Sequence, residues 1–278
     1  MMNRASPLRQ RSQIPVTASP HREVQDADPP HLEFLGLRFS LLPQDEVVSR
    51  LIAETGAPYR YVVTPNAYDV VLANEQRARV LPVYRAAWLS VCDSRILRAL
   101  ARLEGRALPL VTGSDLVAAL LSALNTARSA KQVVVVGPDR ATIAALRAAY
   151  PQAAIDVMPA PAGLARNAAA RLAVARACSA RRWDLLLLCV GAPAQQLIAR
   201  QIGELGRTSG VALCVGASID YLTGAQVRAP RWIQMLSLEW AYRLAREPAR
   251  LWRRYLVESP KVLRIYAATR GTRNAAAD

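Results

Sequence analysis

The sequence has little histidine and no closely paired cysteines. Its two histidines are His21 and His31, both near the N-terminus. This argues against a Ser-His-Asp triad, a Cys-His pair or a histidine-rich metal site in the body of the chain. None of the four cysteines belongs to a CxxC pair, so we expect buried free thiols in a reducing compartment.

Long apolar runs are also missing. Residues 1–30 contain no apolar segment of the kind found in signal peptides. No run of about 18 uncharged apolar residues is present that could span a membrane as a helix. We therefore expect a cytoplasmic protein. Peripheral attachment to the inner face of a plasma membrane stays compatible with the sequence.

Acidic residues are scarce relative to basic ones. The chain has 36 Lys and Arg against 21 Asp and Glu, which gives a net charge of +15. Such a charge favours polyanionic partners: nucleic acid, acidic lipid or phosphate-bearing substrates. No recognisable nucleic-acid-binding motif accompanies it, so we expect no nucleic-acid partner, and a basic nucleic-acid-binding protein stays only the less favoured alternative. A hydrophobic content of 52% excludes a wholly disordered chain.

Short apolar runs alternate with helical segments of about 10 to 15 residues, which is typical of βαβ units. The predicted fold class is α/β, with a Rossmann-like, mainly parallel sheet flanked by helices. Strands are expected at 32–39, 61–63, 89–91, 133–136, 155–157, 185–190 and 211–215. Helices are expected at 43–54, 66–79, 94–104, 112–127, 139–149, 168–180 and 194–205. We predict a disordered tail at 1–31, an α/β core at 32–225 and a helical appendage at 226–278.

The predicted appendage is basic and rich in aromatic residues. Nine Lys and Arg face three Asp and Glu between residues 226 and 264. On a helix, one apolar stripe would hold Trp232, Met235, Leu236, Trp240 and Leu244. This pattern predicts a basic amphipathic helix that lies on an anionic membrane surface. A core-facing helix with a solvated basic side would give the same pattern.

Polar or glycine-rich turns follow several strands, at the sheet edge where α/β proteins bind ligands. Thr64 and Asn66 stand at a helix N-terminus, where they could contact phosphate or simply cap the helix. Asp93 follows an apolar strand and could act as a general base or as a helix cap. Gln195 could contact a uracil or a sugar amide, or be a polar residue of a first helical turn. Gly216 would let backbone approach a ligand closely.

Several motifs together resemble one family. GASIDYLTG at 216–224, RAPRWIQ at 228–234 and EWAYRLAREPARLWRRY at 239–255 resemble the C-terminal signature of the WecG/TagA/CpsF glycosyltransferases. TPN at 64–66, Asp93, VTGSDL at 111–116 and GAPAQ at 191–195 occur in the family's order. The resemblance covers about residues 32–265. These enzymes make bacterial surface polysaccharides and wall teichoic acids.

The resemblance implies transfer of a hexose or N-acetylhexosamine from a UDP-sugar to a polyprenyl-diphosphate-linked saccharide, with inversion and without a metal or other cofactor. It implies a catalytic base at Asp93 with Thr64 beside it. The substrate-binding residues that it implies are Asn66, Thr112, Gln195, Gly191, Gly216, Asp220, Arg243, Arg250 and Arg253. The three arginines would close over the diphosphate. A homo-oligomer stays open.

The sequence departs from the family pattern at a few positions. Leu110 stands where the family usually has an arginine before the VTG motif, and Ser94 stands where it usually has glycine. Residues 194–196 read Ala-Gln-Gln where Lys-Gln-Glu is usual. These changes leave open a nucleotide-binding α/β protein with impaired catalysis. The Asp26-Ala27-Asp28 triplet resembles a metal-binding DxD motif, but we interpret it as coincidence because it lies in the predicted tail.

Overall fold

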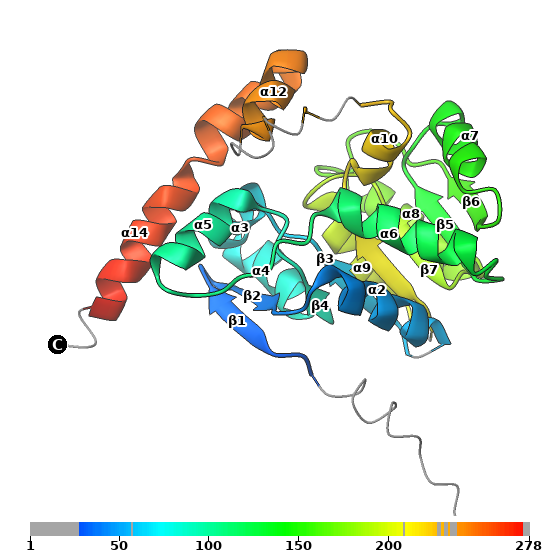
Figure 1. The fold of residues 1–278 in the computed structure, drawn as a ribbon, viewed down its shortest axis with the longest axis horizontal. Helices are drawn as coiled ribbons and strands as arrows, with labels where there is room; N and C mark the ends of the chain where they lie inside the picture. Colours follow the sequence, from blue (N-terminus) through cyan, green and yellow to red (C-terminus); the bar gives the residue numbers. More distant parts are fainter. Residues whose placement is uncertain are drawn as a thin grey trace, which may run out of the picture.

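A computed structural model describes residues 28–56, 58–207, 209–226, 229–230, 233 and 238–274, without the side chains of residues 250 and 272–274. Its centre is a six-stranded parallel sheet with the strand order β4-β3-β8-β7-β5-β6 (Figure 1). The strands are β3 (Arg60–Val63), β4 (Leu89–Ser90), β5 (Gln132–Val136), β6 (Ala154–Met158), β7 (Leu185–Leu188) and β8 (Val211–Cys214). The predicted parallel α/β sheet is confirmed.

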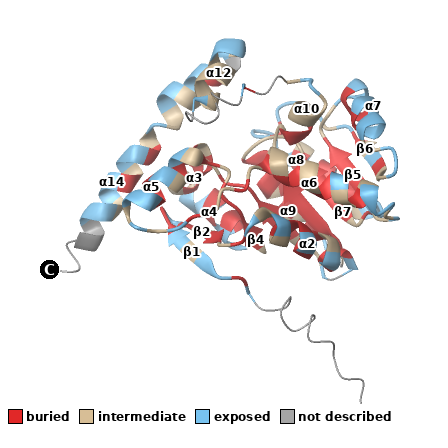
Figure 2. Cartoon of the chain, viewed as in Figure 1, coloured by how far each residue is buried: buried red, intermediate tan, exposed pale blue. Residues whose placement is uncertain are grey.

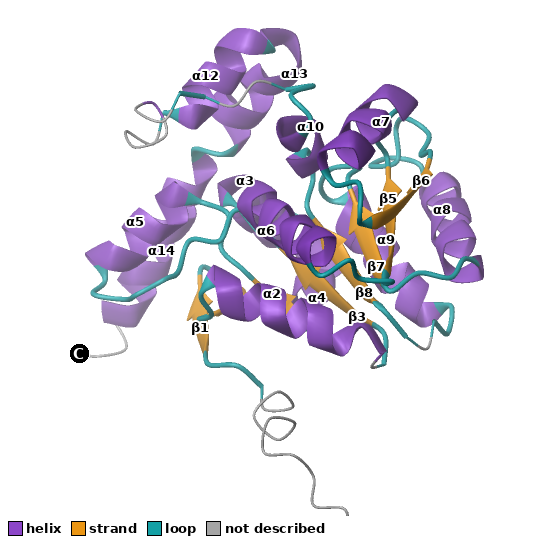
Figure 3. Ribbon diagram, turned by 45° about the vertical axis from the view of Figure 1, so that its right-hand side comes forward, coloured by secondary structure: helices purple, strands orange, loops and turns teal. Residues whose placement is uncertain are grey.

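Both faces of the sheet are covered by helices, which is why the strands are buried, near-continuous Val and Leu runs (Figure 2). One face packs on α3 (Ala67–Glu75), α4 (Arg77–Arg85), α8 (Ala168–Ala180) and α9 (Ala194–Glu204). The other packs on α2 (Gln44–Ala53), α6 (Gly113–Thr126), α7 (Arg140–Ala149) and α10 (Ser218–Leu222). Figure 3 shows the two helical layers on either side of the sheet. The helix α5 (Arg95–Leu103) follows β4.

The first predicted strand is wrong in one respect. Residues 32–39 are not a single strand but a hairpin of β1 (His31–Phe34) and β2 (Leu37–Ser40), paired antiparallel. The turn residues Leu35 and Gly36 have φ values of 52° and 82°. A two-residue turn with both φ values positive matches the twist of paired strands, and glycine adopts it without strain. Leu35 is 2% exposed, so packing of its side chain accompanies its unusual backbone.

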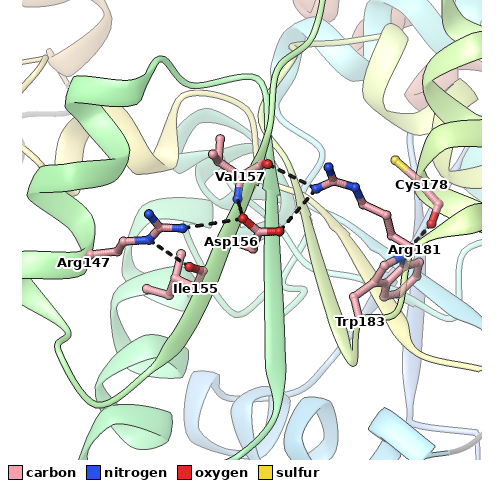
Figure 4. Close-up of polar contacts among 7 residues, drawn as sticks. All are labelled: Arg147, Ile155, Asp156, Val157, Cys178, Arg181 and Trp183. Atoms are coloured by element: carbon pink, nitrogen blue, oxygen red, sulfur yellow. Dashed lines mark hydrogen bonds and ion pairs between the residues drawn. The ribbon is translucent and has the colours of Figure 1, made fainter.

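Strand β6 forms one edge of the sheet, and charged side chains surround it (Figure 4). The Asp156 carboxylate lies 3.6 Å from the Arg147 guanidinium and 3.3 Å from that of Arg181. Arg147 also donates to the Ile155 carbonyl at 2.9 Å. These ion pairs are solvent-exposed and each contributes at most about 1 kcal/mol. Their more important effect is that charge on an edge strand disfavours pairing with another chain.

The C-terminal segment is a series of helices rather than one predicted amphipathic helix. It contains α12 (Glu239–Arg246), α13 (Pro248–Trp252), the π-helical turn η2 (Arg253–Glu258) and α14 (Lys261–Asn274). Of the predicted apolar stripe, Trp232, Met235 and Leu236 lie outside the described residues. The domain boundaries at 31 and 225 stay predictions. Residues 1–27 of the predicted tail also lie outside the described residues.

Helix α14 packs on the core beside α3. Val262 and Tyr266 are 1% and 8% exposed, and the Tyr266 ring lies 6.4 Å from that of Phe34 in an edge-on contact. Lys261 forms an ion pair with Glu75 of α3 at 2.7 Å. Residues of η2 and of the start of α14 share a cavity with Asn66 and Asp93, which follow β3 and β4. In the part of the chain that is described, no helix combines the length and apolarity needed to span a bilayer.

Candidate active site

A cavity of about 410 Å³ lies between the carboxyl ends of β3 and β4 and the C-terminal helices. From the core it is lined by residues that follow the strands: Asn66, Asp93, Ser94, Leu110 and Thr112. From the C-terminal segment it is lined by Glu239, Trp240, Arg243, Arg254 and Tyr255. A second hollow of about 500 Å³ lies at the amino ends of β3 and β4, and none of the predicted site residues lines it. The cavity at the strand ends is therefore the candidate active site.

Asn66 occupies its place because it caps α3. Its side-chain oxygen accepts the Tyr68 N–H at 3.0 Å, and the Asp69 carboxylate accepts the Asn66 N–H at 2.9 Å. This reciprocal arrangement is a capping box. Thr112 caps α6 in a related way, because its hydroxyl oxygen accepts the Asp115 N–H at 3.2 Å. Both residues thus line the cavity as helix caps, with the N-termini of α3 and α6 directed toward it.

Asp93 lies directly beyond β4, and its backbone N–H donates to the Pro65 carbonyl at 3.0 Å. The residue is half-buried. Burial raises the pKa of its carboxyl to about 7, against a stabilising hydrogen bond from the Gly113 N–H and the attraction of Arg243. Glu239 and Asp69 add smaller effects that raise the pKa further. A carboxylate with a pKa near neutrality is well suited to accept a proton from a substrate hydroxyl.

The Gly113 N–H reaches Asp93 because α6 approaches the neighbouring turn closely. A Cβ at this position would lie 2.9 Å from the Ser218 hydroxyl oxygen and 3.4 Å from the Val215 carbonyl oxygen. The contact with the Ser218 hydroxyl is too short for a real Cβ, so any larger residue would require this side chain or the turn to shift. The first N–H of α6 therefore faces the Asp93 carboxylate, as helix N-termini commonly do with anions.

Two arginines of the C-terminal segment face the cavity. Arg243 donates to the Glu239 carboxylate at 2.9 Å, and its guanidinium lies 4.5 Å from the Tyr221 ring centre. Arg254 lies 4.7 Å from the Tyr68 ring centre. The Nε atoms of both arginines are buried and have no hydrogen-bond partner among the residues that the structure describes. Because an unsatisfied buried donor destabilises a fold by about 1–3 kcal/mol, these atoms are suited to an anionic ligand.

Of the other predicted arginines, Arg253 does not join this group. The Arg253 side chain is 73% exposed and pairs with Glu258 at 3.4 Å, and it does not line the cavity. The Arg250 side chain lies outside the described residues. Sequence reasoning missed Arg254, although the Arg-Tyr pair at 254–255 ends the motif on which the resemblance rests. It also missed Glu239, which offsets the charge of Arg243.

The remaining predicted residues gather beyond β7 and β8, next to this cavity. The Gln195 side-chain oxygen accepts the Gly216 N–H at 2.9 Å, and Gln195 is 5% exposed. Gly191 and Gly216 have φ values of 76° and 58°, which glycine tolerates. Asp220 belongs to α10, directly after the Gly216 turn. None of these four residues lines the 410 Å³ cavity.

Thr64 connects the residues of the cavity with the residues that follow β7 and β8. Its hydroxyl donates to the Cys214 carbonyl at 2.9 Å, and the residue is 6% exposed. Since β3 pairs directly with β8, this bond joins the strand ends that carry Asn66 and Gly216. In the described arrangement the Thr64 proton is engaged within the fold. The structure thus brings Asp93, Asn66, Thr112 and Arg243 together and holds Thr64 just behind them.

Fold and cavity together define an α/β protein with its candidate site at the carboxyl edge of a parallel sheet. Residues 32–276 match the model of the glycosyl transferase WecG/TagA/CpsF family, and the chain belongs to that family. Membership implies glycosyltransferase activity in surface polysaccharide biosynthesis. Among the described residues, no group of three or more His, Cys, Asp or Glu is arranged to hold a metal ion. Asp28 of the DxD triplet pairs with Arg38.

Proposed function

We propose that this chain transfers a hexose or an N-acetylhexosamine, of the N-acetylmannosamine type, from a UDP-sugar to a polyprenyl-diphosphate-linked saccharide. The reaction inverts the anomeric centre, uses no metal and takes place at the inner face of a bacterial plasma membrane. One observation carries the proposal: a carboxylate with a pKa near 7 shares a cavity with two arginines whose Nε atoms have no hydrogen-bond partner among the described residues. The family supports the transferase class.

In the proposed reaction Asp93 accepts the proton of the acceptor hydroxyl. The hydroxyl oxygen forms a bond to the anomeric carbon while the bond from that carbon to the UDP oxygen breaks. The electron pair of the broken bond stays on the diphosphate. A positioned general base of this kind contributes about two to four powers of ten in rate.

The negative charge that develops on the departing UDP is stabilised by guanidinium groups in this proposal. Arg243 and Arg254 can each donate two hydrogen bonds to phosphate oxygens, which are shorter and stronger than neutral ones. Their aromatic neighbours Tyr221 and Tyr68 hold the guanidinium planes in place. Arg253, exposed and paired with Glu258, takes no part in the described conformation.

The nucleotide is assigned to the group beyond β7 and β8. There the bond from the Gly216 N–H to Gln195 fixes a turn that carries no Cβ at its tip. Backbone groups at such a turn can approach a flat base or a phosphate closely. In this proposal Gln195 holds the turn in place and does not contact the nucleotide with its side-chain oxygen, which already accepts the Gly216 N–H.

The competing hypothesis of impaired catalysis rests on Leu110 and Ser94, which both line the cavity. The arginine that is usual in the family at the position of Leu110 would have pointed into the same space. A protein that binds the donor but does not turn it over would support that hypothesis. Measured turnover would refute it.

The test is a panel of radiolabelled UDP-sugars with a lipid-linked acceptor, with and without EDTA. Transfer from one donor is expected, and it should survive chelation. Asp93→Asn should reduce transfer at least about a hundredfold, whereas Asp45→Asn, at an exposed position on α2, should not. Undiminished transfer by Asp93→Asn would remove the residue from its assigned role. Loss on chelation that Mn²⁺ or Mg²⁺ restores would contradict the metal-free mechanism.

A further inference from the structure

Large apolar side chains are exposed mainly in one region of the molecule. Among the described residues, every exposed large hydrophobic side chain except Leu205 lies on α5 or in the C-terminal segment. On α5 they are Ile96 and Leu103, which are 38% and 69% exposed. Figures 1 and 3 both show α5 next to α14, and the first turns of these two helices line the same cavity.

The exposed side of α5 is divided into a basic and an apolar half. Arg95, Arg98 and Arg102 are spaced three and four residues apart and form one stripe. Ile96, Ala99 and Leu103 form the adjacent stripe, while Leu97, Leu100 and Ala101 are buried against the core. We call the six outer residues the α5 face. Arginines beside exposed aliphatic residues on one surface are typical of helices that lie in a membrane interface.

The arginines of the α5 face have no counter-charge within the described fold. No ion pair among the described residues involves Arg95, Arg98 or Arg102. Burial, and then the charges of Arg102 and Arg95, lower the pKa of Arg98. Three clustered positive charges that repel one another within the protein favour an external anionic surface.

The rim of the cavity continues this surface. Ile96 of α5, Leu256 of η2 and Leu263 of α14 line the cavity and are 38%, 55% and 54% exposed. Helix α5 and the consecutive helices η2 and α14 therefore each contribute an exposed apolar side chain to the lining of the cavity. Apolar side chains so placed would contact the acyl boundary of a bilayer while nearby arginines contact its head groups.

We infer that the α5 face, together with this apolar rim, is a docking surface for an anionic lipid bilayer, with the cavity mouth held at the leaflet. The inference deepens the proposed function, because a lipid-linked acceptor would then enter Asp93's cavity directly from the membrane. A second copy of the chain fits less well, since a two-fold contact would set the same arginines against each other. Exposed leucine and isoleucine likewise suit lipid better than nucleic acid, which aromatic side chains bind by stacking.

The test compares two full-length triple variants in vesicle co-sedimentation. The first is Arg98→Gln with Arg102→Gln and Leu103→Ser, none of which lines the cavity. The matched control is Arg176→Gln with Arg182→Gln and Leu205→Ser, which removes the same groups from exposed positions near α8 and α9. Vesicles contain either phosphatidylglycerol with phosphatidylcholine or phosphatidylcholine alone. Thermal melts confirm that both variants fold.

Each arginine near an anionic leaflet strengthens partitioning about fivefold, so the α5 variant should bind phosphatidylglycerol vesicles at least about twentyfold more weakly than wild type. The control should bind within about twofold of wild type. Transfer to a short, water-soluble acceptor should be unchanged in the α5 variant, while transfer to a vesicle-embedded acceptor should fall. If neither the wild type nor any variant transfers sugar, the proposed function fails. The vesicle measurement still tests whether the α5 face binds a bilayer.

Equal vesicle binding by the two variants would overturn the inference. So would loss of self-association, or of oligonucleotide binding, in the α5 variant while vesicle binding is kept. Those results would assign the α5 face to a second copy of the chain or to nucleic acid.

Discussion

The pKa of Asp93 predicts that the proposed base reduces the stability of the folded protein. The group has an ordinary pKa of 3.8, and burial in the folded state raises it to about 7. Between these values the unfolded chain is ionised while the folded chain keeps its proton. The folded state then binds more protons, so stability falls as pH rises from about 4 to about 7 and stays at the lower level above that.

The size of the effect follows from the two pKa values. At about 1.4 kcal/mol per pH unit, the interval from 3.8 to about 7 gives a ceiling of about 4 kcal/mol. Asp93 is half-buried, and screening by solvent reduces the expected effect to about 1–2 kcal/mol. Asp93→Asn removes the charge and keeps an oxygen that can accept from the Gly113 N–H. The variant should therefore be more stable than wild type above pH 7, and its advantage should vanish toward pH 4.

Urea denaturation of both proteins at several pH values between 4.5 and 8.5 measures this difference. Asp45→Asn, at an exposed site, should show no comparable growth of stability with pH. Parallel stability curves for wild type and Asp93→Asn across this range would refute the reasoning. Asp93 would then be a well-solvated carboxylate without the environment of a general base. The value of kcat/KM for wild type should also rise with pH to a plateau above about 7, because only the ionised carboxylate accepts a proton.

Further predictions concern the walls of the site. Arg254→Gln should lower the transfer rate by about tenfold to a hundredfold, because a hydrogen bond to a charged group contributes about 1.5–3 kcal/mol; Arg253→Gln is the matched control, and equal losses would contradict the assignment. Gly113→Ala should destabilise the protein by about 1–3 kcal/mol, since its Cβ would meet the Ser218 hydroxyl at 2.9 Å; an unchanged urea midpoint would show that the turn moves freely. Truncation after Thr223 should abolish transfer even to a soluble acceptor; a full rate would make the C-terminal segment only an anchor.

Much of the fold could be predicted from local sequence. The strands are buried on both faces, so their apolar runs stand out, and Thr112 and Asn66 mark helix starts through their capping chemistry. The predicted helix at 66–79 is instead two helices, because Gln76 leaves helical geometry with φ −107° and ψ 46°. Nothing in the apolar pattern marks that break. The sequence pattern does not predict the β1–β2 turn, because Leu35 is apolar and fits the pattern of a continuous strand.

The site was predictable only where it depends on position along a strand. Asp93 follows β4, and residues there must lie at the ligand-binding edge. The pKa of Asp93, in contrast, depends first on burial, which raises it, and then on Gly113 and Arg243, which lower it and meet Asp93 only through the fold. Arg253 and Arg254 are consecutive residues of η2, and only the fold shows that the first is exposed while the second lines the cavity.

Arg243 couples the two halves of the proposed reaction. Its positive charge lowers the pKa of Asp93, and its guanidinium also faces the space assigned to the diphosphate. A diphosphate that pairs with Arg243 would neutralise that charge and weaken its effect on the carboxylate. Asp93 would then become a stronger base at the moment when the donor is in place. Because the Glu239 carboxylate already offsets part of the positive charge of Arg243, the change in the pKa of Asp93 should be moderate. The same arginine would thus favour departure of UDP and, once occupied, favour proton removal from the acceptor.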